Sequence, residues 1–199
     1  MSGERQTLVV VGIGADGAAG LSPEARAHVA RAELLAGGKR QLDYFLDFAG
    51  PRVVLEGDLR QAIAQLQANR TQRCVVLASG DPLYFGIGKL LLEHFEGAEL
   101  QFVPHVSSVQ LAFARIKQSW HDARVVSLHG RPLDALRAAL AEDAGKIALF
   151  TDAHNTPAAI ARVLRENDRD FTLWVCENLG GPEERVRSVP RDEVERGPC

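Results

Sequence analysis

The chain has 199 residues, of which 46% are hydrophobic, and 23 Lys and Arg against 26 Asp and Glu give it a net charge of −3. This composition is typical of a globular protein with a buried core and excludes collagen, coiled coil and a disordered chain. A slightly negative charge without a basic block also argues against a dedicated nucleic-acid binder.

Targeting signals and disulfide frameworks are absent from the sequence. No apolar run reaches the 18 residues that a membrane span requires, and the first residues lead into a strand-like run without a signal-peptide core. The cysteines are Cys74, Cys176 and Cys199, which are too far apart for a metal motif or a disulfide scaffold. We therefore expect a soluble, cytoplasmic protein that binds neither membrane nor metal.

Apolar runs alternate with helical patterns along the first half of the chain. Runs without polar alternation are typical of buried parallel strands, and they occur at 8–11, 53–55, 74–78 and 100–103. Helices are predicted from Ser22-Pro23, where Ser is the N-cap and Pro the first helical residue, and over 59–68 after Asp58. Strands that alternate with helices predict an α/β fold with a mainly parallel sheet.

The second half continues the alternation in a different style. Strands are predicted at 124–128, 146–150 and 171–176, with helices over 132–142 and from Thr156-Pro157 to Leu164. Residues 185–189 alternate, which predicts a half-exposed antiparallel strand and therefore a mixed sheet. The pattern breaks near 117–122. We therefore predict two α/β domains, 1–117 and 118–199.

A glycine-rich turn follows the first strand. Residues 12–17 match G-x-G-x-x-G, which brings backbone N–H groups close to a dinucleotide pyrophosphate in some α/β proteins. The context differs from that motif, because the helix signal at Ser22-Pro23 comes after the third glycine and no acidic residue clearly ends a second strand. A tight turn without a ligand is the alternative interpretation.

Other glycine-, serine- and charge-bearing loops follow predicted strands. Residues 79–88 contain Asp81, suited to accept hydrogen bonds from an amine or a ribose, and 104–108 end in two serines. In open α/β sheets, ligands bind at the carboxyl ends of the strands. A helix-capping turn is the alternative for both loops. Residues 37–40 form a predicted basic loop, and 127–132 place a His and an Arg around a glycine; each has a solvated surface turn as its alternative.

Common catalytic signatures are missing, including G-x-S-x-G, H-E-x-x-H and the P-loop. Their absence favours a reaction in which both substrates already carry the reactivity and the protein aligns them.

Taken in order, six segments resemble the tetrapyrrole methylase family, and more specifically its branch that methylates precorrin-6Y or precorrin-7 at carbon 5 in cobalamin biosynthesis. The resemblance extends from Leu8 to about Val189. The segments are 11–14 with 21–22, 37–40, 79–82 with 86–88, 104 with 107–108, 127–131, and 177–180 with 184–185.

The resemblance implies two α/β domains with the active site in the cleft between them, a homodimer, and S-adenosylmethionine as the methyl donor. It implies that Asp81 and the backbone over 83–86 hold the ribose and amino-acid part, that the serines of 107–108 contact the carboxylate end, and that Thr151 and 176–178 line the adenine pocket. The cofactor-binding residues implied in this way are Ala15, Ser79, Asp81, Tyr84, Gly86, Ser107, Ser108, Thr151, Cys176, Glu177 and Asn178.

For the macrocycle, which carries many carboxylates, the resemblance and the charge pattern give a second set of candidates. The substrate-binding residues expected are Gly14, Lys39, Arg40, His129 and Arg131, and the catalytic candidates are His129, for moving the displaced proton, and Asp16.

Two features depart from the family pattern. His105 stands where relatives often have a small residue, and relatives usually continue into a last strand after the point where this sequence ends. Many relatives also carry a second domain that acts at carbon 15, so we expect fusion to, or partnership with, such a domain. Alternatives are a methylase of the same family for another substrate, such as ribosomal RNA or a protein side chain, an NAD-dependent oxidoreductase, and a non-catalytic tetrapyrrole-binding domain.

Overall fold

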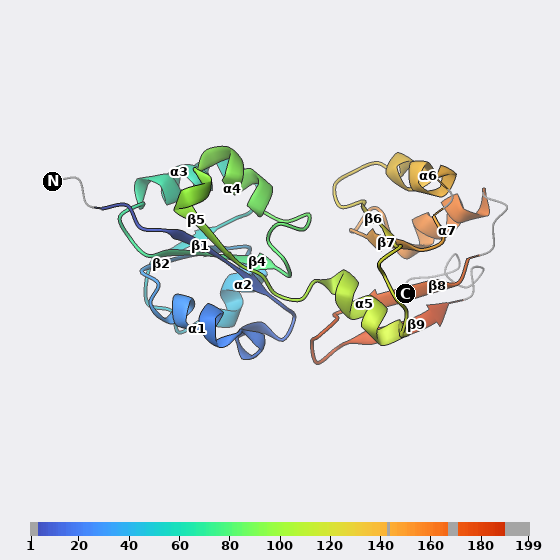
Figure 1. Ribbon diagram of the computed structural model, residues 1–199, viewed down its shortest axis with the longest axis horizontal. Coiled ribbons are helices and arrows are strands. Elements are labelled where there is room, and N and C mark those ends of the chain that lie inside the picture. Colours follow the sequence, from blue (N-terminus) through green and yellow to red (C-terminus); the bar gives the residue numbers. More distant parts are fainter. Residues whose placement is uncertain (1–3, 143, 167–170, 190–199) are drawn as a thin grey trace. The chain divides into compact units, whose positions relative to one another are not determined.

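The computed structural model describes residues 4–142, 144–166 and 171–189 (Figure 1). The chain divides into two compact units, one of Met1–Ser108 with Gly180–Pro182 and one of Val109–Leu179 with Glu183–Cys199. The first unit ends at Ser108, the first residue of the helix over 108–116, whereas the predicted domain boundary lies after that helix, at 117. The two domains 1–117 and 118–199 stay a prediction.

The first unit is built on a five-stranded, fully parallel sheet in the order β3-β2-β4-β1-β5. Its strands are β1 (Leu8–Ile13), β2 (Leu34–Gly37), β3 (Arg52–Val54), β4 (Cys74–Ser79) and β5 (Leu100–Val103). The helical segments are η1 (Gly17–Gly20), α1 (Pro23–Ala30), α2 (Lys39–Leu42), η2 (Asp43–Phe45), α3 (Leu59–Ala68), α4 (Gly88–His94) and η3 (Gly97–Glu99). The predicted α/β class with a parallel sheet is confirmed.

Both faces of this sheet are buried, which explains the continuous apolar runs of its strands. Along β1, Val9 and Val11 pack on the side of α1 and α2, whereas Val10 packs on the side of α3 and α4 (Figure 1). Val10 and Val11 are completely buried. Each such side chain contributes about 1.5–3 kcal/mol through its removal from water.

The structure of residues 34–42 differs from the prediction. No strand was predicted there, and residues 37–40 were expected to form a basic loop. Leu35 and Ala36 are fully buried in β2, and Lys39–Leu42 forms the single turn of α2. The backbone N–H of Lys39 donates to Glu56 Oε1 at 2.9 Å. This partner lies 17 residues along the chain, so the local sequence carries no signal for the helix.

The first unit contains a topological switch point. The helices that follow β1 and β2 cover one face of the sheet, and those that follow β3 and β4 cover the other (Figure 1). The adjacent strands β1 and β4 therefore lead into helices on opposite faces. Open α/β sheets bind their ligands in the crevice that such a divergence leaves at the carboxyl ends of the strands.

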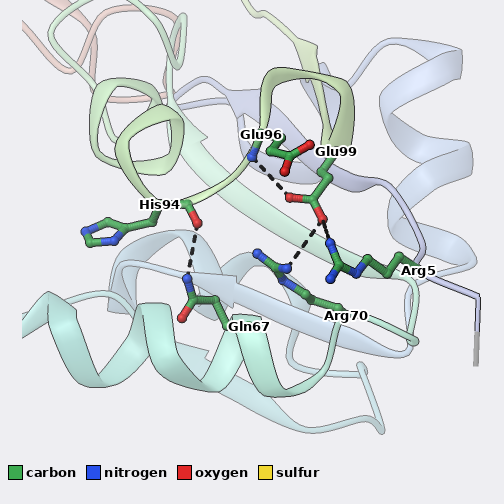
Figure 2. A network of polar contacts seen from close by, with 6 residues as sticks. All are labelled: Arg5, Gln67, Arg70, His94, Glu96 and Glu99. Carbon is green, nitrogen blue, oxygen red and sulfur yellow. Dashed lines mark hydrogen bonds and ion pairs between the residues drawn. The ribbon is translucent and has the colours of Figure 1, made fainter. Parts of the chain in front are cut away.

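The amino edge of the same sheet is held by a polar network (Figure 2). Glu99 Oε1 lies 3.0 Å from Arg5 NH1 and 3.4 Å from Arg70 NH1, and Glu99 Oε2 accepts the Glu96 N–H at 3.1 Å. The Arg70 guanidinium lies 5.2 Å from the centre of the Phe95 ring. Ion pairs at a surface contribute little to stability individually. This network links the residues before β1, β4 and β5 at the edge opposite the switch point.

The second unit contains α5 (Ser108–Ile116), β6 (Arg124–Ser127), α6 (Asp134–Ala141), β7 (Ile147–Phe150), α7 (Pro157–Arg165), β8 (Leu173–Glu177) and β9 (Arg185–Val189). Its core lies between β6, α6 and α7 and includes the fully buried Leu128. Strands β6 and β7 are parallel, and β8 and β9 are antiparallel. Both kinds of pairing were expected, but in the described residues they form two separate two-stranded sheets rather than one mixed sheet.

No helix in the described part of the chain combines the length and the apolar character needed to cross a bilayer.

Candidate functional site

The loops that follow β1, β4 and β5 meet at the switch point of the first unit. The Gly80 N–H donates to Ile13 O at 3.0 Å, and the His105 N–H donates to Gly80 O at 3.2 Å. A Cβ on Gly12 would come within 3.0 Å of Gly80 O and of the His105 backbone nitrogen. Glycine at position 12 is therefore what permits three backbone segments to approach one another here.

The loop after β4 is shaped by unusual backbone angles and by Asp81. Gly80 has φ +59° and Phe85 has φ +57°, which is uncommon for a bulky residue. Asp81 Oδ1 accepts the Leu83 N–H at 2.9 Å, and Asp81 O accepts the Tyr84 N–H at 3.0 Å. The loop thus holds the Asp81 carboxylate in one orientation at the end of a buried strand.

The two loops carry apolar side chains that remain open to solvent. Leu83 and Phe85 from the β4 loop and Val106 from the β5 loop are about half exposed. Phe85 packs against Tyr84 in an edge-to-face arrangement with ring centres 5.0 Å apart, and burial raises the pKa of Tyr84. Exposed apolar side chains beside a fixed carboxylate are suited to a ligand with apolar and polar parts.

The serines of the β5 loop differ in exposure. Ser107 is buried and lies against the position of a Gly80 Cβ, whereas Ser108 is exposed and begins α5. Glycine at position 86 lies against Pro82 O, and a Cβ there would come within 3.0 Å of that oxygen. The predicted cofactor residues of the first unit thus lie on loops that contact one another.

The glycine-rich turn after β1 does not open a helix. Gly17 starts the short segment η1, and α1 begins at Pro23 after Ser22, whose Oγ accepts the Ala25 N–H at 3.1 Å. The helix start predicted at Ser22-Pro23 is confirmed. A dinucleotide motif would place the helix N-terminus at the third glycine, so this geometry does not support the dinucleotide alternative.

Gly14 and Ala15 are partly buried in this turn, and Asp16 is exposed. Asp16 Oδ1 lies 3.9 Å from His105 Nε2, and the Tyr44 hydroxyl lies 3.4 Å from Ala15 O. The predicted catalytic candidate Asp16 therefore shares the edge with the β5 loop. His105 contributes to this edge and is absent from the predicted site.

The predicted basic segment after β2 borders the same edge. Lys39 and Arg40 are exposed, and Arg40 Nε lies 3.4 Å from the Tyr44 hydroxyl. The next residue, Gln41, donates from Nε2 to Ser79 Oγ at 2.8 Å and so connects the segment to the end of β4. No local pattern points to Gln41 or Tyr44, because their contacts depend on β2 lying beside β4.

In the second unit, His129 and Arg131 lie on a tight turn after β6. The Arg131 N–H donates to Leu128 O at 3.1 Å, and Gly130 has φ +65°. A four-residue turn with a glycine of positive φ in third place is a type II β-turn. The side chains of His129 and Arg131 are both exposed on it.

Two residues outside the predicted site hold this turn. Asp152 accepts N–H groups from Gly130 at 2.7 Å, His154 at 2.8 Å and Asn155 at 2.7 Å. These backbone hydrogen bonds keep the pKa of the Asp152 carboxyl well below its usual range. Asp152 and Asn155 were missed because ordinary Asp and Asn residues before a helix indicate only a turn.

The remaining predicted residues of the second unit lie at the ends of β7 and β8. Thr151 and Asn178 are exposed, and Asn178 has φ +51°. Cys176 is half-buried, and burial raises the pKa of its thiol. Among the described residues, none donates a hydrogen bond to the buried Glu177 Oε2, which forms an ion pair with Arg187 Nη2 at 3.9 Å.

The depressed pKa of Asp152 predicts a pH-dependent contribution to stability. A carboxyl whose pKa falls on folding stabilises the native state above its ordinary pKa of about 3.9, and this stabilisation is lost as the pH falls through the folded value. We expect Asp152→Asn to lower the free energy of unfolding at pH 5–8 and to differ progressively less from wild type below about pH 4. Denaturant unfolding across this range measures the difference.

The control for this prediction is Thr156→Ala. It removes the N-cap of α7, in which Thr156 Oγ1 accepts the Ala159 N–H at 3.3 Å, but it removes no titrating group. Its destabilisation should stay constant with pH. An Asp152→Asn effect that is equally constant would contradict the prediction.

Comparison with known proteins gives a consistent result for most of the chain. The family model of tetrapyrrole (corrin/porphyrin) methylases matches residues 7–195. The cobalt-precorrin-7 C(5)-methyltransferase of Salmonella typhimurium is 37% identical over 188 residues, which cover 94% of this chain and 92% of that protein. The decarboxylating precorrin-6Y C(5,15)-methyltransferase of Sinorhizobium sp. is 38% identical over 181 residues, which cover 90% of this chain but 44% of that protein.

Solved structures agree with the fold. The precorrin-6Y methylase of Archaeoglobus fulgidus superimposes with a TM-score of 0.69 at 27% identity and covers 95% of this chain and 92% of that one. A uroporphyrin-III C-methyltransferase of Thermus thermophilus, solved with S-adenosylhomocysteine, has a TM-score of 0.69 at 21% identity and covers 95% and 85%. At that identity the second comparison supports the fold.

Proposed function

Because this chain belongs to the tetrapyrrole (corrin/porphyrin) methylase family, we propose that it transfers a methyl group from S-adenosylmethionine to carbon 5 of a precorrin macrocycle. The observation that carries the proposal is the switch point between β1 and β4, where the predicted cofactor loops meet through Gly12, Gly80 and His105. The 37% identity to a protein of this activity over 92% of its length supports the same assignment.

The residues at this edge suit S-adenosylmethionine. The ligand combines polar ribose and amino-acid parts with a short methylene chain and a positively charged sulfonium, and the edge combines the Asp81 carboxylate with the exposed side chains Leu83, Phe85 and Val106. Glycine at positions 80 and 86 lets this loop pack closely against Ser107 and Pro82 and so keeps its shape at the edge. When bound, the cofactor supplies a methyl group that is already activated by the positive charge on its sulfur.

The protein's own contribution would be orientation and exclusion of water. We propose that Asp81 and residues 84–86 bind the ribose and amino-acid part and that Ser107 and Ser108 bind its carboxylate, with Ala15 and Ser79 beside them. In the second unit, Thr151, Cys176 and Asn178 are proposed for the adenine. Glu177 Oε2, to which no described residue donates a hydrogen bond, suits a donor such as an adenine amine or a ribose hydroxyl.

We propose that exposed cationic side chains of this protein bind the carboxylates of the macrocycle. Lys39 and Arg40 at the end of β2 and Arg131 after β6 are positioned on strand ends, where charge-assisted hydrogen bonds to substrate carboxylates are possible. Gly14 would border the macrocycle. His129 and Asp16 are proposed to accept or hold the proton displaced at the methylated carbon.

The test of the proposed function is calorimetric titration of the chain with S-adenosylhomocysteine, with NAD as the control ligand, followed by methyl transfer from S-adenosylmethionine to cobalt-precorrin-7. We expect micromolar binding of the first ligand, none of the second, and a product that has gained one methyl group. Binding of NAD alone would return the 12–17 turn to its dinucleotide interpretation. Cofactor binding without transfer would point to another acceptor.

Two expectations about partners remain proposals. We propose that the chain forms a homodimer, which sedimentation equilibrium measures directly. We also propose that a partner domain or protein catalyses the carbon 15 reaction, because the Sinorhizobium relative, whose name includes both positions, is matched over only 44% of its length. Addition of two methyl groups by this chain alone would contradict the second proposal.

A further inference from the structure

The turn that carries His129 and Arg131 is held at its backbone by two side chains. Asn155 is 9% exposed, and its Nδ2 donates to Leu128 O at 2.6 Å and to Arg131 O at 2.9 Å, the two ends of the turn. Asp152 Oδ2 accepts the Gly130 N–H at 2.7 Å, in the middle of the turn. One side chain therefore holds both ends and the other holds the centre.

These two residues are not needed to begin the next helix. Thr156 is the N-cap of α7, with its Oγ1 accepting the Ala159 N–H at 3.3 Å, and Pro157 occupies the first helical position. The second Asp152 oxygen, Oδ1, accepts the N–H groups of His154 and Asn155, so it orders the segment that presents Asn155. The polar groups of the pair are directed to the turn and to each other, with Asn155 Nδ2 and Asp152 Oδ2 3.4 Å apart.

Resting on the function proposed above, we propose that Asp152 and Asn155 are positioning residues that fix the 128–131 turn and thereby direct His129 and Arg131 toward the carboxylates of the macrocycle. Gly130 has φ +65°, which glycine adopts without strain, so the backbone angle by itself does not hold the turn against motion. Buried hydrogen bonds to Leu128 O and Arg131 O leave the turn one arrangement, while the His129 and Arg131 side chains stay exposed for the ligand. Preorganisation of this kind reduces the ordering cost of binding.

The test variant is Asp152→Asn, because it removes only the hydrogen bonds that Asp152 Oδ2 accepts, from the Gly130 N–H and from Asn155 Nδ2. The side-chain oxygen of Asn still accepts the His154 and Asn155 N–H groups, whereas its amide nitrogen would face the Gly130 N–H and lose that hydrogen bond. We expect the KM for cobalt-precorrin-7 to rise about tenfold, while the Kd for S-adenosylhomocysteine stays within about twofold. Asn155→Ala, which frees both ends of the turn, should raise the KM further.

The matched control is Thr156→Ala. It lies beside Asn155 and weakens the start of α7, but it does not contact the turn, so its KM should remain that of wild type even where its thermal stability falls as much as that of Asp152→Asn. A second control places Asp152→Asn in a His129→Ala/Arg131→Ala background. If Asp152 acts through those side chains, the substitution should add nothing there.

An unchanged KM in Asp152→Asn, an equal rise in Thr156→Ala, or a rise that persists in the His129→Ala/Arg131→Ala background would overturn the inference. The two proposals fail differently. Absence of methyl transfer by the wild-type chain would reject the proposed function and this inference with it, whereas wild-type transfer with an unresponsive Asp152→Asn would reject the positioning role alone.

Discussion

Gly12→Ala is expected to lower the free energy of unfolding by about 3 kcal/mol, at the upper end of the range for overpacked cores. A Cβ at this position meets Gly80 O and the backbone nitrogen of His105, both within 3.0 Å. Neither backbone atom rotates away as a side chain would, so β4 or the β5 loop must shift. Denaturant unfolding followed by circular dichroism measures the loss.

The same substitution should weaken S-adenosylhomocysteine binding even in the folded fraction, because it separates the loops that meet at the switch point. The control is Gly97→Ala, since a Cβ there has no atom within 4 Å and should change stability by no more than about 0.5 kcal/mol. Equal stability of the two variants would show that the close approach at Gly12 is not required by the fold.

Asp81→Ala is expected to reduce the affinity for S-adenosylhomocysteine by about 10- to 100-fold, because a hydrogen bond to a charged group contributes about 1.5–3 kcal/mol and each 1.4 kcal/mol is tenfold. The variant loses both the carboxylate and the acceptor for the Leu83 N–H, a hydrogen bond of 2.9 Å. Calorimetric titration measures the change.

Asp81→Asn separates those two effects. Its side-chain oxygen still accepts the Leu83 N–H, so the loop keeps its shape while the charge is lost, and we expect an intermediate affinity. The control is Asp58→Ala. Asp58 also accepts a nearby backbone N–H, that of Arg60 at 3.0 Å, but it caps α3 in the connection after β3, away from the strand ends of β1 and β4. Wild-type affinity in Asp81→Ala would restrict Asp81 to holding its loop.

The sequence predicted the elements whose signals are local. The helix over 59–68 and its Asp58 cap, and the start of α1 at Ser22-Pro23, are confirmed because capping chemistry acts within one turn of helix. Strand β2 was not predicted because it has only four residues and is followed directly by a helix of four residues, so neither has a long local pattern. The strand is defined by its pairing with β4.

The residues of the candidate site also fall into those with a local sequence signal and those that depend on distant contacts. Residues at the ends of predicted strands, such as Asp81 and His129, could be named as candidates because the carboxyl edge of a parallel sheet is the expected place for a ligand. Gln41 and Asn155 could not, because the bonds that define their roles span 38 residues to Ser79 and 27 residues to Leu128. Such contacts leave no periodic or compositional trace in the sequence.

The strand order has a consequence for folding. Strand β4 lies between β1 and β2, which precede it in the chain and do not pair with each other. Neither β1 nor β2 can pair with β4 until residues 74–79 have been synthesised. Pairing between strands that are far apart in the sequence slows folding. Strand β4, which joins β1 to β2, also ends at Ser79, next to Gly80. A ligand that requires the finished edge would therefore favour the folded chain by about 2.7 kcal/mol at a concentration 100 times its Kd.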